Sequence, residues 1–97
     1  MWRNLSVGNN IMHMVLIENG SATNNRFIVG LKGAITGDGV KITEFTGDVK
    51  TLENENGTQE VVKTELKDGE LVIVTKSNQK YVIYNLGPNG GLIRKVD

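Results

Sequence analysis

The sequence predicts an all-β protein, a small antiparallel barrel or sandwich of about seven short strands. The chain of 97 residues contains 11 valines, 8 isoleucines and 8 threonines, the β-branched residues that favour strands. It contains only two alanines, although alanine is the best helix former. The 12 glycines and 11 asparagines mostly stand between the apolar runs, where tight turns are expected. A chain of this length forms one domain, so residues 1–97 are predicted to be a single all-β domain.

The clearest element is a three-stranded meander over about residues 60–86. Its first turn is predicted at Asp68-Gly69, because a type I′ turn needs positive φ at both central residues and this dipeptide favours it. Opposite charges and paired apolar side chains across the strands support a two-residue loop at this point. The aligned pairs are then Lys67–Glu70, Leu66–Leu71, Glu65–Val72 and Thr64–Ile73.

A second turn is predicted at Ser77-Asn78, followed by a strand over 80–84. The strand over 70–76 then has a partner on each side and apolar residues on both faces. A continuous apolar run of this kind is typical of a central strand that is covered on both faces. With a two-residue loop, the aligned pairs are Val74–Tyr81, Ile73–Val82 and Val72–Ile83.

The rest of the chain follows the same pattern less sharply. Gly33 and Gly47-Asp48 are interpreted as turns that separate short strands. Residues 1–17 also permit a helical stripe, and the choice between a barrel and a sandwich stays open. The remaining strands are predicted over 11–18, 26–31, 34–36, 40–45, 49–52 and 92–96.

The composition excludes several classes of function. Lys and Arg number 11, as do Asp and Glu, so the net charge is zero, whereas a general nucleic-acid binder needs a basic face. The apolar run at 11–17 is too short for a membrane span and lacks the basic leader and cleavage site of a signal peptide. The absence of cysteine excludes disulfides and fits a reducing compartment. A cytoplasmic protein that does not bind membranes is expected.

The sequence contains no catalytic or metal-binding motif, so a non-enzymatic protein without cofactor or metal is predicted. His13, the single histidine, is interpreted as a partly buried, hydrogen-bonded residue or one at a sheet edge. A catalytic base would need a nucleophile, and the chain offers neither a cysteine nor a Gly-x-Ser-x-Gly elbow. Glu53 and Glu55 do not have the spacing of a calcium loop and are assigned to a solvated loop.

Five residues are candidate contacts for a ligand or partner: Trp2, Arg3, Arg26, Tyr81 and Arg94. Arginine suits the recognition of phosphate, and exposed aromatic side chains suit protein interfaces. Tyr81 and Tyr84 are three residues apart on one strand and point to opposite faces, so only one can face the core. Trp2 is either tucked under the mouth of the barrel or used in an interface.

Two functions from different classes remain open. The first is an interaction protein that acts stoichiometrically on a protein partner, for example an inhibitor of phage or bacterial type. The second is a homo-oligomer that binds or sequesters a small anionic ligand, such as a nucleotide or metabolite. In the second case, edge strands over 11–18 or 92–96 pair between subunits and form the pockets.

Overall fold

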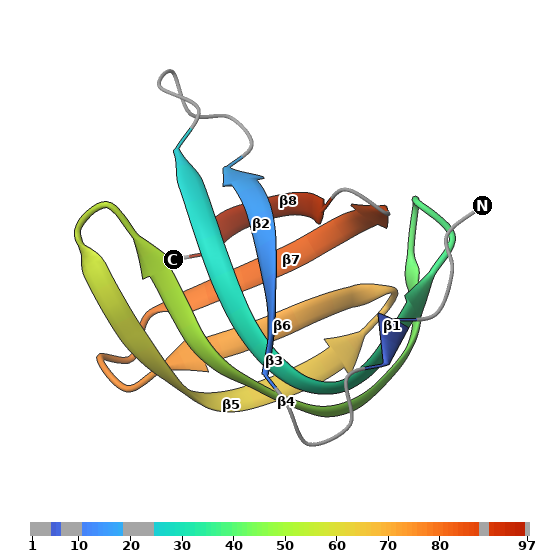
Figure 1. Cartoon of the computed structure of the whole chain (residues 1–97), viewed down its shortest axis with the longest axis horizontal. Helices are drawn as coiled ribbons and strands as arrows, with labels where there is room; N and C mark the ends of the chain where they lie inside the picture. Colours follow the sequence, from blue (N-terminus) through green and yellow to red (C-terminus); the bar gives the residue numbers. More distant parts are fainter. Residues whose placement is uncertain (1–4, 7–10, 19–24, 88–89, 97) are drawn as a thin grey trace.

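The computed structural model describes residues 5–6, 11–18, 25–87 and 90–96, which form strands and turns (Figure 1). This part of the chain contains no helix that is both long and apolar enough to cross a lipid bilayer. The strands are β1 (Leu5–Ser6), β2 (Met12–Glu18), β3 (Arg26–Gly37), β4 (Ile42–Asn54), β5 (Gly57–Lys67), β6 (Glu70–Thr75), β7 (Lys80–Gly87) and β8 (Gly90–Val96).

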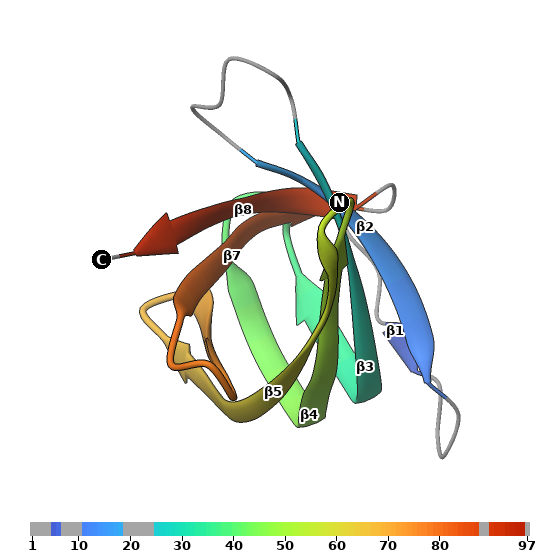
Figure 2. The same cartoon turned by 90° about the vertical axis from the view of Figure 1, so that its left-hand side faces the viewer.

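Strands β2 to β8 form a closed seven-stranded barrel in which each strand pairs with the next one along the chain (Figures 1 and 2). Consecutive strands of a meander alternate in direction, so an odd number of strands brings the first and the last together in parallel. β2 and β8 close the barrel in this way, with Leu16 opposite Gly91. The predicted all-β fold is therefore confirmed, and it is a barrel. The short β1 pairs with the second half of β3.

The predicted edge strands over 11–18 and 92–96 lie inside the closed sheet. β2 pairs with β3 on one side and with β8 on the other, and β8 also pairs with β7. The parallel pairing joins residues 16–18 to residues 91–93, whose backbone groups are therefore engaged within the barrel. Closure of a barrel removes edges of this kind. These residues are therefore not free to form the edge-to-edge pairing between subunits that the sequence suggested.

The hydrophobic core fills the barrel. It is built from every second residue along each strand, because successive side chains point alternately into and out of the barrel. In β6, Leu71 and Ile73 are buried on the inner face, whereas Val72 and Val74 are half-buried on the outer face. The strand predicted to be covered on both faces is therefore covered completely on its inner face and in part on its outer face. The buried core consists of Met14, Leu16, Phe27, Val29, Leu31, Ile35, Ile42, Val49, Leu52, Val61, Leu71, Ile73, Tyr81, Ile83 and Ile93.

The β5–β6 hairpin has the register that the sequence predicts. Asp68 and Gly69 both have positive φ, at 52° and 80°, as a type I′ turn requires. Lys67 then lies opposite Glu70, and the predicted pairing continues up to Thr64 opposite Ile73. The alignment predicted from the turn dipeptide and the cross-strand pairs is therefore confirmed from Lys67 to Thr64.

The β6–β7 hairpin differs from the prediction by one residue. Tyr81 lies opposite Ile73 instead of Val74, because the loop has three residues instead of two. Asn78 adopts a φ of 67°, and its backbone N–H donates to the carbonyl oxygen of Thr75 at 2.9 Å. Asparagine tolerates this left-handed conformation, which makes the longer loop accessible. A slip of one residue moves side chains to the opposite face, so Tyr81 joins the inward-facing row.

β3 and β4 are each one long strand, where the sequence predicted short strands separated by glycine turns. Gly33 and Gly47 lie opposite each other in the middle of the β3–β4 ladder, with φ of 112° and 107°. A register shift between Gly30 and Leu31 adds a β-bulge to the same ladder. Glycines and bulges bend strands without ending them. These features therefore curve β3 and β4 around the barrel.

Candidate functional site

The five candidate residues from the sequence do not converge on one site. Trp2 and Arg3 lie outside the described residues. Arg26 is exposed at the start of β3, Tyr81 is buried in β7, and Arg94 is half-buried in β8. Arg26 and Tyr81 line two different hollows.

Tyr81 is a core residue, which corrects its assignment as an exposed contact. Its exposed fraction is 5%, and its ring packs at a tilt against Phe27 with 5.7 Å between the ring centres. Its hydroxyl donates to Oε1 of Gln79 at 3.1 Å. The three-residue loop before β7 turns Tyr81 inward, and Tyr84 lies on the outer face instead.

Arg94 forms an intramolecular clamp on the outer face of β6, β7 and β8. Its Nη1 and Nη2 donate to the two carboxylate oxygens of Glu70 at 3.3 and 3.2 Å. The guanidinium also lies 4.9 Å from the centre of the Tyr84 ring. The hydrogen bond with Glu70 raises the pKa of Arg94 above its ordinary value. Arg94 is therefore already paired and does not present a free cation.

The position of this clamp explains a buried residue on the outside of the barrel. β7 lies between β8 and β6, so the Arg94 side chain has to cross β7 to reach Glu70. Val82 of β7 lies opposite Arg94, and it is 4% exposed although its neighbours in the strand face inward. We infer from this path that the arginine stem covers the valine, as long charged side chains commonly cover apolar surface.

The outer face of β2 and β3 carries an exposed apolar patch, named here the aliphatic pad and formed by Ile11, Val15 and Ile28. Their exposed fractions are 48%, 42% and 36%. Val15 lies directly opposite Ile28 in the β2–β3 ladder. Ile11 and Val15 share the outward-facing row with His13, because residues two apart on a strand share a face. Val15 and Ile28 are therefore adjacent, and Ile11 lies on the other side of His13.

Gly30 lies at the centre of this face, opposite His13. A Cβ atom at Gly30 would lie 2.5 Å from Oγ1 of Thr51, 3.3 Å from Cγ2 of Ile11 and 3.8 Å from Nε2 of His13. These neighbouring side chains close over the glycine backbone. A side chain at Gly30 would therefore displace at least the Thr51 hydroxyl.

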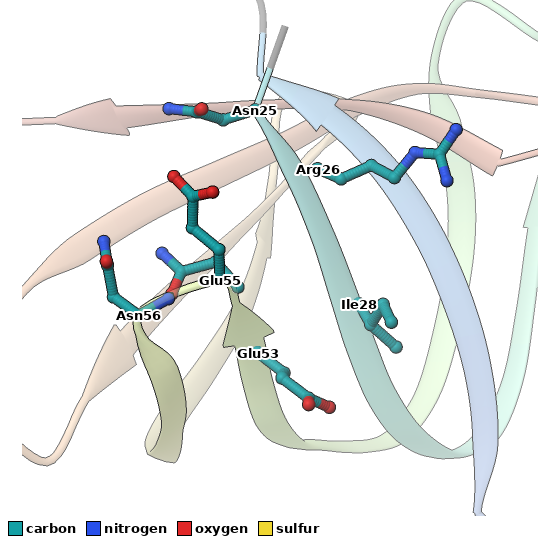
Figure 3. A pocket seen from close by; sticks show the side chains of 7 residues that line it. Asn25, Arg26, Ile28, Glu53, Glu55 and Asn56 are labelled. Atoms are coloured by element: carbon teal, nitrogen blue, oxygen red, sulfur yellow. The ribbon is translucent and has the colours of Figure 1, made fainter. Parts of the chain in front are cut away.

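A hollow of about 370 Å³ opens where Ile28 approaches the β4–β5 turn, and we name it the Arg26 hollow (Figure 3). Arg26, Glu53 and Glu55 bring charges of both signs to its lining. Figure 3 shows the Arg26 side chain extending away from Glu55. These three charged groups have no ion-pair partner within the described part of the chain. This end of the pad is therefore a polar rim with charges available for a partner.

A second hollow of about 600 Å³ adjoins the pad at Ile11 and extends over β3, β4 and β5. Lys32, Lys50 and Glu60 supply its charges. Lys50 also lies 3.4 Å from Asp48, in an exposed ion pair. The pad therefore lies between two hollows that charged residues help to line.

Groups suited to catalysis do not gather on this face. His13 is exposed, and it forms no hydrogen bond or ion pair with the described residues. The described residues also contain no cluster of three or more His, Asp or Glu side chains that could hold a metal ion. An acid–base histidine needs a partner that orients its ring. His13 has no such partner among the described residues.

Comparison of the chain with protein-family models, curated proteins and solved structures finds no match. The function is therefore inferred from the surface itself. The sequence analysis did not identify the pad, although the alternation of Ile11, His13 and Val15 indicates one shared face. Ile28 joins that face only through the pairing of β2 with β3, which no turn dipeptide specifies.

Proposed function

We propose that this protein is a non-enzymatic binding protein that engages a protein partner stoichiometrically through the aliphatic pad. The observation that carries the proposal is the exposure of Ile11, Val15 and Ile28 on one face, where Val15 and Ile28 lie side by side and Ile11 lies beyond His13. Such a patch is unfavourable in water unless a partner covers it. The charged residues that line the hollows at its two ends match the polar rim that surrounds the apolar centre of most interfaces.

Burial of the pad supplies only part of the binding free energy. Complete burial of one aliphatic side chain contributes about 1.5–3 kcal/mol, and these three are already more than half-buried. The pad therefore contributes about 3 kcal/mol, compared with about 8 kcal/mol for a micromolar complex. The remainder has to come from the rim, where the hollows can receive side chains of the partner.

The charges of the rim indicate the chemistry of that partner. The Arg26 hollow combines one cation with two carboxylates, and the hollow beside Ile11 combines Lys32 and Lys50 with Glu60. A polyanion such as nucleic acid gains little from this balance. A folded protein with protruding apolar side chains and charges of both signs fits better. An inhibitory role of phage or bacterial type and a cytoplasmic location remain predictions.

Site-specific photo-crosslinking tests the proposal. A photoreactive phenylalanine analogue replaces Ile28 in one variant and Val62 in a control variant. Val62 is 60% exposed on β5 and lies outside the pad. Both variants are irradiated in an extract of the source organism. We expect one discrete adduct at position 28 that is absent at position 62, and that disappears when Val15→Asp is added to the first variant.

The mass of the adduct distinguishes the alternatives. An adduct with one protein partner at one-to-one stoichiometry supports the proposal. An adduct with twice the mass of this chain shows that a second copy covers the pad, and overturns the proposed partner. Equal adducts at positions 28 and 62, or no dependence on Val15, contradict a role of the pad.

A further inference from the structure

The β4–β5 and β6–β7 turns lie at the same end of the barrel (Figure 1), where the inward-facing rows change from apolar to polar residues. Asn54 lies two residues beyond the buried Leu52, and Lys95 lies two residues beyond the buried Ile93. Residues two apart share a face, so both side chains continue the core rows. Lys95 also lies directly opposite the inward-facing Tyr81. This end of the barrel is therefore lined by polar side chains from several strands.

A hollow of about 480 Å³ lies at this end, and we name it the barrel-end hollow. Among the described residues, Lys95 is the one charged residue that lines it. The Arg26 hollow on the other side of the β4–β5 turn differs, because Glu53 and Glu55 line it together with Arg26. The described lining of the barrel-end hollow thus carries a single cation.

Two amide side chains of the barrel-end hollow have their oxygen atoms engaged within the protein. Oδ1 of Asn54 accepts a hydrogen bond from the backbone N–H of Asn56 at 2.9 Å. Oε1 of Gln79 accepts one from the hydroxyl of Tyr81 at 3.1 Å. Because an amide carries its acceptor and its donors on different atoms, each NH₂ group remains available to donate.

A chain of hydroxyl groups fixes the third amide, that of Gln59. The backbone N–H of Gln79 donates to Oγ1 of Thr75 at 3.1 Å. The hydroxyl of Ser77 donates its single proton to Oε1 of Gln59 at 3.1 Å. The Thr75 hydroxyl therefore donates to Oγ of Ser77, at 3.0 Å. The NH₂ groups of all three amides and the ammonium of Lys95 have no hydrogen-bond acceptor among the described residues.

We infer that the barrel-end hollow binds the phosphate or carboxylate group of a small molecule. Three amide NH₂ groups and the ammonium of Lys95 line one hollow, and donors beside a cation favour an oxyanion. Its volume lies in the range of small-molecule sites, and the mouths of barrels commonly hold them. The inference does not rest on the proposed function, because the donors named here lie outside the aliphatic pad. The sequence analysis suggested arginines as the residues that bind an anion, whereas this inference assigns that role to Lys95.

NMR titration with inorganic phosphate tests this inference. Uniformly ¹⁵N-labelled protein is titrated with sodium phosphate at neutral pH, with sodium chloride keeping the ionic strength constant. We expect saturable shifts of the side-chain NH₂ signals of Asn54, Gln59 and Gln79, which a general salt effect does not produce. A parallel titration with acetate distinguishes the two groups: a response to phosphate alone assigns a phosphorylated ligand, and a response to acetate assigns a carboxylate.

Three variants make the test specific. Gln79→Glu keeps an acceptor for the Tyr81 hydroxyl but replaces the NH₂ donor with oxygen, and Lys95→Met removes the cation. Each is expected to weaken phosphate binding about tenfold, the scale of one charge-assisted hydrogen bond. Lys80→Met is the matched control, because Lys80 carries the same charge and is exposed on the outer face of β7. Absence of saturable shifts, or equal weakening by Lys80→Met, would overturn the inference.

Discussion

Gly33 of β3 and Gly47 of β4 lie directly opposite each other, and both have a φ that side chains rarely adopt. A Cβ atom at Gly33 would overlap the carbonyl oxygen of Thr46, and one at Gly47 would overlap that of Lys32. Both contacts involve backbone atoms, which cannot rotate away as a side chain can. The glycine pair therefore allows two long strands to approach closely where the barrel bends.

Gly33→Ala is expected to lower the free energy of unfolding by about 3 kcal/mol, because it adds a backbone clash to an unfavourable φ. Gly57→Ala is the matched control, since Gly57 has a φ of 128° and nothing lies within 4 Å of its hypothetical Cβ atom. The control substitution should lower the free energy of unfolding by about 1–2 kcal/mol, because only its φ is unfavourable. Urea unfolding followed by circular dichroism measures both values. Equal losses would show that the close approach of β3 and β4 does not matter.

Gly69→Val is expected to destabilise the protein by about 1–2 kcal/mol, because a β-branched residue resists the positive φ of a type I′ turn. The φ of Gly69 is 80°, and a Cβ atom there would lie 2.9 Å from both Cβ and Cγ of Lys41, so the Lys41 side chain would also have to shift. Gly69→Asn should lose less, since asparagine tolerates this conformation. Thermal unfolding compares the variants, and an unchanged melting temperature for Gly69→Val would rule out the assigned turn.

Arg94→Ala is expected to lower the free energy of unfolding by about 1–2 kcal/mol, mainly because it exposes Val82 to water. The ion pair itself contributes less than about 1 kcal/mol, since the Arg94 and Glu70 side chains are 42% and 36% exposed. Arg94→Met keeps an unbranched stem over Val82 and should therefore retain most of the stability. Denaturant unfolding in low and high salt separates the two contributions. An equal loss in Arg94→Met would assign the stabilisation to charge instead of coverage.

Sequence patterns predicted the fold class and one hairpin because those features depend on local chemistry. The Asp68-Gly69 turn specifies both its own φ values and the register of the strands beside it. The other predictions failed where one local signal has two physical outcomes. Glycine suits a turn, but Gly33 and Gly47 occupy a bend inside paired strands. Asn78 permits a three-residue loop as readily as a two-residue one, and that single residue decides where Tyr81 points.

The candidate sites depend on contacts between distant segments, which the sequence specifies weakly. Arg26 is the one predicted residue that lines a hollow beside the pad. Val15 and Ile28 become neighbours only through the β2–β3 register. The donors of the barrel-end hollow come from three separate strand ends and the β6–β7 loop. Single arginines and aromatics, which the sequence analysis favoured, turned out to be paired or buried at Arg94 and Tyr81.

The most direct test of the account is the affinity of the crosslinked partner, once purified, for variants of the pad. Isothermal titration calorimetry compares the unmodified protein with Val15→Asp and with Val62→Asp, two exposed valines given the same new charge. Val15→Asp should weaken binding by at least about tenfold, because it leaves a carboxylate buried against apolar groups. Val62→Asp should bind as the unmodified protein does. Undiminished affinity of Val15→Asp would contradict the assignment of the aliphatic pad as the partner-binding surface.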